Sequence, residues 1–359
     1  MIHIKIVETG KFHWQMGYAN GEFDVDEFIQ KEGIRHQQEL RKEYEKYMDE
    51  PMHSIITEYW KEIGVKKDLY PGDLATVSNR RDSNYYSVLG PMELEEGRNY
   101  PVIYFSHGGG DESFHAETYG VAEYIQKEPF FYVCPNRWGA EEFERILDEL
   151  LTNGYPIDES RVYAMGFSGG SASTAEIAVH SPMRVTAVAL IPGANALNQV
   201  RLQENLNVFI ENRSLHVPTI FIGGASDGGD SWPLVDDCSF DNYNHWMKHV
   251  AGVKDFAQMS KTDSDNLTRK SKDFVERNFG LRFHKTYINE WNGEFIYVGD
   301  FLNEDGACIA RFASVKGYPH GVYPVFTGIA WEYLKELRKD TKTGKVVYPI
   351  PEMDFRTRR

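Results

Sequence analysis

The stretch that decides the fold is RVYAMGFSGGS, residues 161–171. Its first half is an apolar run of residues that favour strands, and a helical pattern follows it. Between them, Gly166-Phe-Ser168-Gly-Gly170 forms a Gly-x-Ser-x-Gly turn. Such a turn strains the serine backbone, and the glycines leave room for the strand and the helix. The sequence therefore predicts that Ser168 is an exposed nucleophile at a strand end; the alternative is a Gly-rich turn with only a structural role.

Outward from this turn, short apolar runs alternate with helical stretches. Such alternation is typical of an α/β fold in which helices cover both faces of a mostly parallel sheet, and right-handed crossovers make a doubly wound sheet the simplest arrangement. The expected strands lie at residues 85–89, 101–106, 130–134, 162–166, 186–191 and 218–222. The expected helices lie at residues 115–127, 140–152, 170–180 and 234–250.

The remaining segments have other patterns. Residues 24–63 combine many charged residues with apolar residues at near-helical spacing, which predicts one or two amphipathic helices. Residues 253–280 are charged and helix-like, and residues 285–312 predict a hairpin around Asn292-Gly293. Residues 325–337 predict a further helix.

We expect three parts in the chain: an N-terminal extension over residues 1–80, a catalytic domain over residues 81–345 and a tail over residues 346–359. The apolar stripe of the extension must be buried. We expect it to cover the mouth of the active site, to form a subunit contact, or to pack on the outer helices of the same domain.

A second motif, His107-Gly-Gly-Gly, follows the expected strand at 101–106. Loops of this kind supply N–H groups that stabilise an oxyanion in lipases and esterases. Gly108 or Gly109, together with the N–H of Gly169, is the expected oxyanion hole. A phosphate-binding Gly-rich loop is the alternative, but two acidic residues follow at once and no Walker-type lysine is present, which disfavours anion binding.

The acid that orients the catalytic base should lie in a loop after a later strand. Residues 217–227 contain an apolar run, a short Gly224-Ala-Ser turn and then Asp227. Asp227 is therefore the expected acid. Asp230 lies in the same loop and is the rival candidate.

The base should follow the last strand. His320 lies in a Gly/Pro loop directly before the helical run at 325–337. Its position completes the order Ser, Asp, His that the α/β-hydrolase arrangement requires. His245 and His249 lie in a helical pattern, where a packing or surface role is expected.

These motifs carry a family resemblance. Residues 155–170, together with His107-Gly-Gly-Gly, Gly224-Ala-Ser-Asp227 and Pro319-His320, resemble the polyhydroxybutyrate-depolymerase-like and the feruloyl and acetylxylan esterases. The resemblance covers about residues 85–340. It implies an α/β-hydrolase fold and a serine carboxylesterase that hydrolyses small acyl or aromatic esters without a metal or cofactor. A peptidase of the prolyl-oligopeptidase type is the nearest alternative, and a catalytically silent binding protein on the same fold is another.

The chain departs from this family in three features: the helical N-terminal segment, the charged insertion around residues 253–282, and the lack of a visible export signal. These features argue against a secreted polymer-degrading role. Trp138 and Trp232 are candidates for flanking an acyl or aromatic group, and packing in the core or at its rim is the alternative for both.

Composition limits the partners. The 359 residues are 41% hydrophobic and 26% charged, as in soluble globular proteins. The net charge of -15 and the lack of a basic run exclude nucleic acid and anionic membranes as expected partners, and favour a small-molecule ester. The first residues lack a signal-peptide pattern, so we expect a cytoplasmic protein, with a homo-oligomer possible. Cys134, Cys238 and Cys308 are too widely spaced to predict disulfides or a zinc site.

Overall fold

A computed structural model describes residues 42, 46, 52–55, 58–70, 84–109, 111–191, 197, 215–224, 232–234, 240–266, 274–291, 294–316 and 320–349. Most of the helical segment expected at 24–63 lies outside these residues.

The strands of the described residues build one large sheet. They are β1 His53–Ile55, β2 Val65–Tyr70, β3 Tyr86–Pro91, β4 Tyr100–Ser106, β5 Phe131–Pro135, β6 Ile157–Phe167, β7 Ala187–Ile191, β8 Thr219–Gly224, β11 Lys285–Trp291, β12 Glu294–Leu302 and β13 Cys308–Val315. The 11-stranded order is β1-β2-β3-β5-β4-β6-β7-β8-β13-β12-β11. Neighbours from β5 through β13 run parallel, and the strands at both ends pair antiparallel. The predicted α/β-hydrolase fold class, with its mostly parallel doubly wound sheet, is confirmed.

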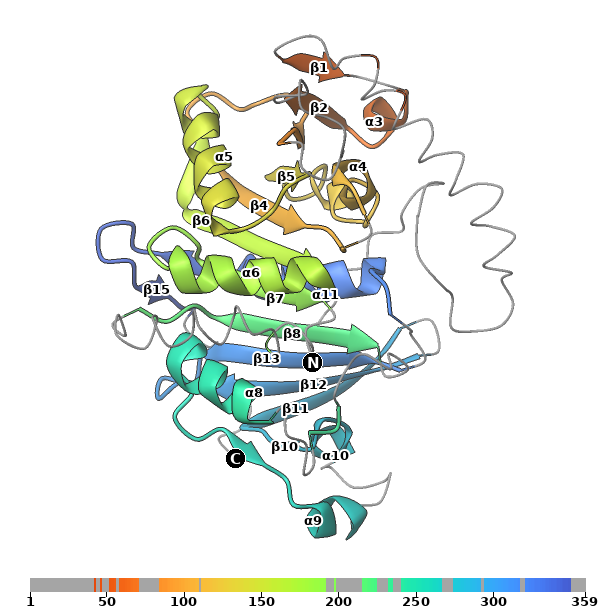
Figure 1. Cartoon of the computed structure of the whole chain (residues 1–359), viewed down its shortest axis with the longest axis vertical. Helices are drawn as coiled ribbons and strands as arrows, with labels where there is room; N and C mark the ends of the chain where they lie inside the picture. Colours follow the sequence, from red (N-terminus) through yellow and green to blue (C-terminus); the bar gives the residue numbers. More distant parts are fainter. Residues whose placement is uncertain are drawn as a thin grey trace, which may run out of the picture.

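Helices cover both faces of the sheet (Figure 1). One face carries α5 Ala140–Thr152, α6 Gly169–His180, α8 Phe240–Trp246, the π-helical turn η5 Met247–Ala251 and α10 Phe274–Phe279. The other carries α3 Glu58–Glu62, α4 Ser113–Ala116, the 3-10 turn η3 Ala122–Tyr124 and α11 Pro324–Leu334. In the described part of the chain, no helix has both the length and the mean hydropathy needed to cross a bilayer.

The two faces of the sheet bury separate apolar layers, and β6 contributes to both. Val162 and Ala164 pack in the layer beneath α5 and α6, whereas Tyr163, Met165 and Phe167 pack in the layer beneath α11. This alternation follows from the period of two along a strand. From Val162 to Phe167 both faces are buried and the strand is apolar, which is why the sequence predicts this part; the preceding residues 158–161 are polar and are not buried.

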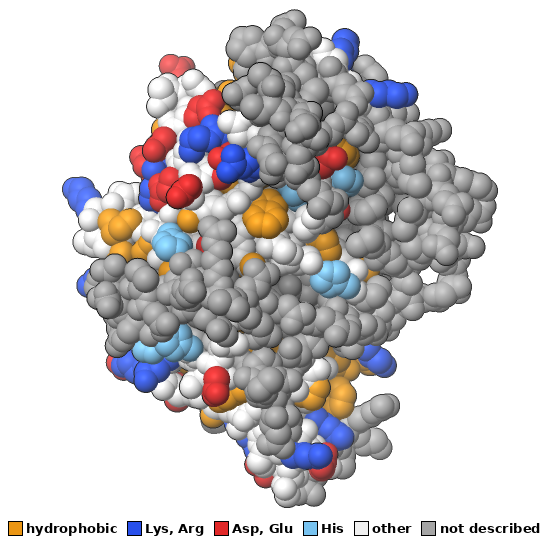
Figure 2. Space-filling view, in the orientation of Figure 1, with side chains coloured by type: hydrophobic (Ala, Val, Ile, Leu, Met, Phe, Trp, Pro, Cys, Tyr) orange, Lys and Arg blue, Asp and Glu red, His pale blue; other side chains and the backbone are white. Residues whose placement is uncertain are grey.

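The outer side of α5 faces solvent. Figure 2 shows charged side chains of both signs over this helix. Arg145 pairs with Glu142 and with Glu149 at 2.7 Å, and Arg184 pairs with Glu144 at 2.9 Å. Exposed pairs of this kind contribute little to stability, so the helix is held mainly by its buried apolar side.

All six predicted strands are found, although β6 begins earlier than expected. The helix predicted at 115–127 is wrong: the chain forms only α4 and η3 there, because Gly120 between them has a φ of 81°, which ends a helix. Of the helix predicted at 234–250, the structure describes α8 and the π-helical turn η5 that follows it. The insertion contains the short α9 Lys261–Asn266 and α10, and its strands β9 Ala257–Gln258 and β10 Leu281–Arg282 pair with each other.

The predicted hairpin is found, since β11 and β12 pair antiparallel on either side of Asn292-Gly293, two residues that lie outside the described ones. The helix predicted at 325–337 corresponds to α11. Near the C-terminus, β14 Arg338–Lys339 and β15 Val346–Val347 form a separate two-stranded ladder.

The end of the N-terminal segment is part of the central sheet. The helix predicted over residues 24–63 is wrong where β1 lies, because β1 pairs antiparallel with β2, and β2 pairs with β3.

Lys67 on β2 is fully buried, and its Nζ lies 2.8 Å from Glu117 Oε2. Ser87 Oγ donates to the other oxygen of Glu117 at 2.6 Å. A buried ion pair thus joins β2 to the residue that ends α4.

We expect Lys67→Met to destabilise the protein by about 3–5 kcal/mol, because it leaves the Glu117 carboxylate buried without its cation. The double variant Lys67→Met/Glu117→Gln should recover most of this loss, since the neutral amide can still accept from Ser87. Urea unfolding of the wild type, each single variant and the double variant measures both effects. A single variant as stable as the wild type would show that the pair has no such role.

Candidate active site

The loops that carry the predicted site residues leave the sheet at one edge. Parallel strands place their carboxyl ends together, and β4, β6, β8 and β13 are parallel. Figure 1 shows their arrowheads on the same side. The loop with His107 follows β4, Ser168 follows β6, the loop of Asp227 and Asp230 follows β8, and the loop of His320 follows β13. Asp227 and Asp230 themselves lie outside the described residues.

Ser168 has the backbone strain that the sequence predicts. Its φ is 52° and its ψ is -116°, and it stands between the last residue of β6 and the first residue of α6. In the described residues it is the one non-glycine residue with a positive φ. Its N–H donates to Ile191 O at 2.9 Å, so the end of β7 helps to hold it. Strain of this kind persists only where the surrounding structure enforces it.

Close packing around the turn holds Ser168 in this strained conformation. A Cβ at Gly170 would lie 2.0 Å from the carbonyl oxygen of Ser106, and one at Gly166 would lie 2.2 Å from Gly170 O. The first turn of α6 is therefore pressed against the end of β4, with no room for a side chain between them. Ser171 ties the turn together, since its hydroxyl donates to Gly166 O at 2.7 Å and accepts from the N–H of Ile191 at 3.0 Å.

The loop after β4 comes close to the nucleophile turn. A Cβ at Gly169 would lie 3.3 Å from the backbone nitrogen of Gly109 and 3.9 Å from the ring of Trp138. Gly108 is buried against the ring of Phe167, whereas Gly109 is exposed. The fourth residue of the motif, Gly110, lies outside the described residues. The predicted oxyanion-hole residues Gly109 and Gly169 are thus side by side.

His107 fixes the start of this loop. Its ring nitrogens lie 2.8 Å from Gly108 O and 2.9 Å from Asn136 O, and the indole Nε1 of Trp138 lies 3.4 Å from its Nδ1. Burial lowers the pKa of His107, so the ring is neutral near pH 7. A neutral imidazole carries one N–H, so His107 donates to only one of the two carbonyl oxygens, and its enclosed ring positions the loop without adding a charge to the site.

A carboxylate supports the next turn of the loop. The N–H of Asp111 donates to Gly108 O at 3.0 Å, and the Tyr119 hydroxyl donates to Asp111 Oδ2. Burial raises the pKa of Tyr119, which keeps the phenol proton in place for this bond. Asp111 therefore stabilises this turn of the loop, and this explains why an acidic residue directly follows the glycines.

His320 lies next to the nucleophile turn. Its ring and that of Phe167, the residue before Ser168, have centroids 5.1 Å apart. The imidazole is exposed, and Gly321 beside it is buried. Tyr323 occupies the N-cap position of α11 and Pro324 lies in its first turn, where the fixed φ of proline suits the start of a helix.

The two tryptophans have different surroundings. Trp138 is half-buried between His107 and Gly169, so it borders the nucleophile turn. Trp232 packs against Phe279, with centroids 4.9 Å apart, and against Phe312 in the apolar layer beneath α8. The structure therefore brings Trp138 to the candidate site and places Trp232 in an aromatic cluster.

Sequence reasoning did not assign the supporting residues Ser171, Asp111 and Phe167. Ser171 has a local signal, because a small polar residue early in the helix after Gly-x-Ser-x-Gly can bond back to the strand. The other two have none: the bond from Tyr119 to Asp111 and the contact of Phe167 with His320 join segments that only the fold brings together.

No family model and no curated protein matches the chain. Solved structures do resemble it. An acetyl xylan esterase from Aspergillus awamori is 12% identical, with 79% of this chain and 98% of that chain covered and a TM-score of 0.44. A feruloyl esterase module from Clostridium thermocellum, in complex with sinapinate, is 14% identical, with 75% and 86% covered and a TM-score of 0.41. An S-formylglutathione hydrolase from Staphylococcus aureus is 11% identical, with 55% and 87% covered and a TM-score of 0.39.

We expect Gly170→Ala to destabilise the protein by about 3 kcal/mol or more, because its methyl group would overlap Ser106 O and force α6 away from β4. Gly109→Ala is the matched control from the same site, since open space surrounds that position, and it should change stability by less than about 0.5 kcal/mol. Urea unfolding followed by tryptophan fluorescence measures both. Equal stability of the two variants would contradict the close packing at Gly170.

Proposed function

We propose that the chain is a serine carboxylesterase that hydrolyses small acyl or aromatic esters through an acyl-enzyme on Ser168. The observation that carries the proposal is the strained backbone of Ser168 at the carboxyl end of β6, with Gly109 close to its neighbour Gly169 and the His320 ring close to its neighbour Phe167. A serine in this conformation at the start of a helix is what nucleophilic attack on a carbonyl requires.

In the first step, Ser168 Oγ attacks the ester carbonyl while His320 takes the hydroxyl proton. The carbonyl oxygen becomes an oxyanion, and the N–H groups of Gly169 and of Gly108 or Gly109 donate to it. The proximity of Gly109 and Gly169 supports this assignment. The N-terminal end of α6 points at the same place and favours the negative charge.

The tetrahedral intermediate collapses when the alkoxide leaves with the proton from His320, and Ser168 then carries the acyl group. Water attacks this ester with His320 again as base, and the carboxylic acid leaves as Ser168 regains its proton. Asp227 is the proposed acid that accepts from the imidazole Nδ1–H and stabilises the imidazolium, with Asp230 as its rival. The short connection from Gly224, the last residue of β8, to Asp227 supports this choice.

The acyl group would lie against Trp138, whose ring is half-buried beside Gly169. An indole face suits a flat or short acyl chain, and this supports an acetyl- or feruloyl-type ester of the kind that the family resemblance implies.

The central test is covalent labelling. A fluorophosphonate probe should label the wild type at Ser168, and Ser168→Ala should remain unlabelled, because the probe reacts with an activated serine. Turnover of acetyl, butyryl, feruloyl and peptide substrates measures the preference, and we expect the esters to be cleaved far faster than the peptide. Ser173→Ala, a buried serine of α6 away from the turn, is the control and should label like the wild type. Labelling that survives Ser168→Ala would overturn the assignment, and efficient peptide cleavage without ester turnover would favour a peptidase.

The base and acid have their own test. His320→Ala should lower kcat by a factor on the order of 10⁴ or more, while His180→Ala at the exposed end of α6 should leave it unchanged.

Asp227→Asn should also lower kcat by a factor on the order of 10⁴, because the imidazole loses its orienting acceptor, and Asp230→Asn should lower kcat much less. Single-turnover acylation of a chromogenic ester measures all four. A larger loss for Asp230→Asn would move the role of acid to that residue.

A further inference from the structure

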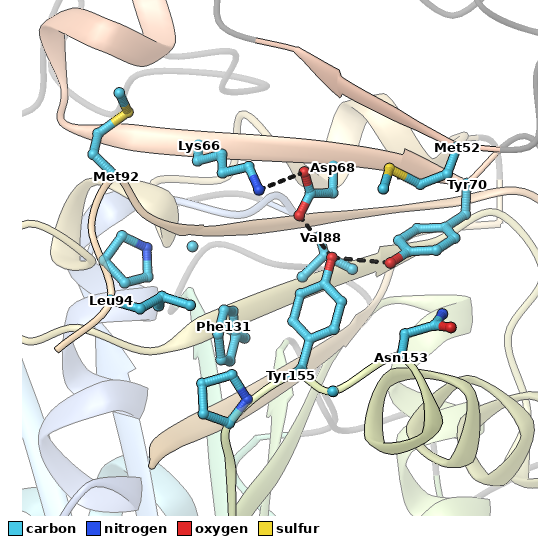
Figure 3. Close-up of a pocket in the computed structure, with 14 residues that line it drawn as sticks. Met52, Lys66, Asp68, Tyr70, Val88, Met92, Leu94, Phe131, Asn153 and Tyr155 are labelled. Carbon is cyan, nitrogen blue, oxygen red and sulfur yellow. Dashed lines mark hydrogen bonds and ion pairs between the residues drawn. The ribbon is translucent and has the colours of Figure 1, made fainter. Parts of the chain in front are cut away.

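A cavity of about 620 Å³ lies near the β1 edge of the sheet, on the face that carries α5. Figure 3 shows its walls, which come from β2 and β3, the start of β5 and the turn between α5 and β6. A volume of this size is within the range of small-molecule sites in proteins.

This cavity is remote from Ser168. Pro156 in its wall comes directly before β6, and Ser168 comes directly after it. Ile157 pairs with Tyr100 and Gly166 pairs with Ser106, so β6 spans about the length of the seven-residue β4, and its two ends are on the order of 20–25 Å apart at about 3.3 Å per residue. A small ligand in this cavity does not contact Ser168, so its binding is independent of the proposed esterase activity.

Exposed apolar side chains gather at its rim. In the described residues seven large hydrophobic side chains are exposed, and three of them line this cavity: Met52 at 47%, Met92 at 39% and Leu94 at 50%. Single exposed apolar residues are ordinary, but several around one cavity indicate a binding surface. Methionine side chains are flexible and adapt to varied apolar shapes. Phe131 and Val88 form the apolar floor.

The opposite wall holds a chain of hydrogen-bonded polar side chains, drawn with dashed lines in Figure 3. Lys66 Nζ lies 3.1 Å from Asp68 Oδ1, which also accepts from Ser54 Oγ at 2.6 Å. Tyr155 donates to Asp68 Oδ2 at 2.7 Å and accepts from the Tyr70 hydroxyl at 3.0 Å. Burial raises the pKa of both tyrosines, so both remain phenols near pH 7 and keep the carboxylate in place.

This arrangement selects against charge. Asp68 has both oxygens engaged, while Lys66 has a 40% exposed side chain with N–H donors beyond its bond to Asp68. An anion drawn to Lys66 would meet the Asp68 carboxylate, and a cation drawn to Asp68 would meet the Lys66 ammonium. A neutral oxygen acceptor can take a hydrogen bond from Lys66 without either penalty.

We propose that this cavity binds a small neutral amphiphile, whose aromatic or aliphatic body packs between Leu94, Met92 and Phe131 and whose hydroxyl or carbonyl oxygen accepts from Lys66.

The experiment uses three probes of one shape and different charge: 2-naphthol, 2-naphthoate and 2-naphthylmethylamine. Calorimetric titration of the full chain at about pH 7 should show binding of the neutral naphthol, with the anion and the cation at least about tenfold weaker. Leu94→Glu should weaken naphthol binding by at least about tenfold, because it places a charge at the apolar rim. Ile288→Glu, at an exposed apolar residue on β11 outside this cavity, should bind like the wild type.

Lys66→Met gives a second, sharper readout. It should weaken naphthol binding and strengthen binding of the naphthylmethylammonium ion, because Asp68 loses its cation while Ser54 and Tyr155 still hold it. Ser168→Ala should bind naphthol like the wild type, which separates this cavity from the candidate active site. Unchanged binding in Leu94→Glu, tighter binding of the anion than of naphthol, or loss of binding in Ser168→Ala would each overturn the proposal.

Discussion

The carbonyl oxygen of Ser106 lies where a side chain at Gly170 would have to be, 2.0 Å from the position of its Cβ. This contact fixes how close α6 can come to β4, and it also fixes the turn that joins β6 to α6. Since Ser168 is the residue in that turn, its positive φ results from the packing of two glycines against backbone atoms. A looser contact would let the turn relax and would withdraw the serine from the sheet edge.

The loop after β4 is the second part that must be held, because its N–H groups are useful only at fixed positions. It is anchored at its start by His107, between Gly108 O and Asn136 O. It is anchored again further on, where Glu117 pairs with Lys67 from β2. The strand β2 therefore does more than extend the sheet: it supplies the buried cation beneath the segment that supports the candidate oxyanion loop. This gives part of the N-terminal segment a structural role that its charged sequence does not suggest.

The sequence predicted those elements whose signals are local. A buried parallel strand is an apolar run, and Gly-x-Ser-x-Gly between such a run and a helix has few other structures available to it, so β6, α6 and the place of Ser168 followed directly. The helix expected at 115–127 failed because Gly120 outweighed the helical pattern around it. The strand β1 was missed because three residues give too short a pattern, and its pairing with β2 is what makes it a strand. Trp138 and Trp232 looked equivalent in sequence, since only the fold decides that one borders Gly169 and the other packs on Phe279.

The cavity lies near the N-terminal end of β6, and the candidate active site lies at its C-terminal end. The residues of β6 alternate between two apolar layers, with Ala164 and Met165 fully buried on opposite sides, so neither face can shift without opening a core. Coupling between distant sites needs an element with two arrangements that both ligands bias. From Tyr163 to Gly166 the strand is buried on both faces and paired on both edges, which makes it a poor element of that kind. Binding at the cavity beside Tyr155 and chemistry at Ser168 should therefore be independent, and any influence of one on the other would have to run through the loops rather than through the sheet.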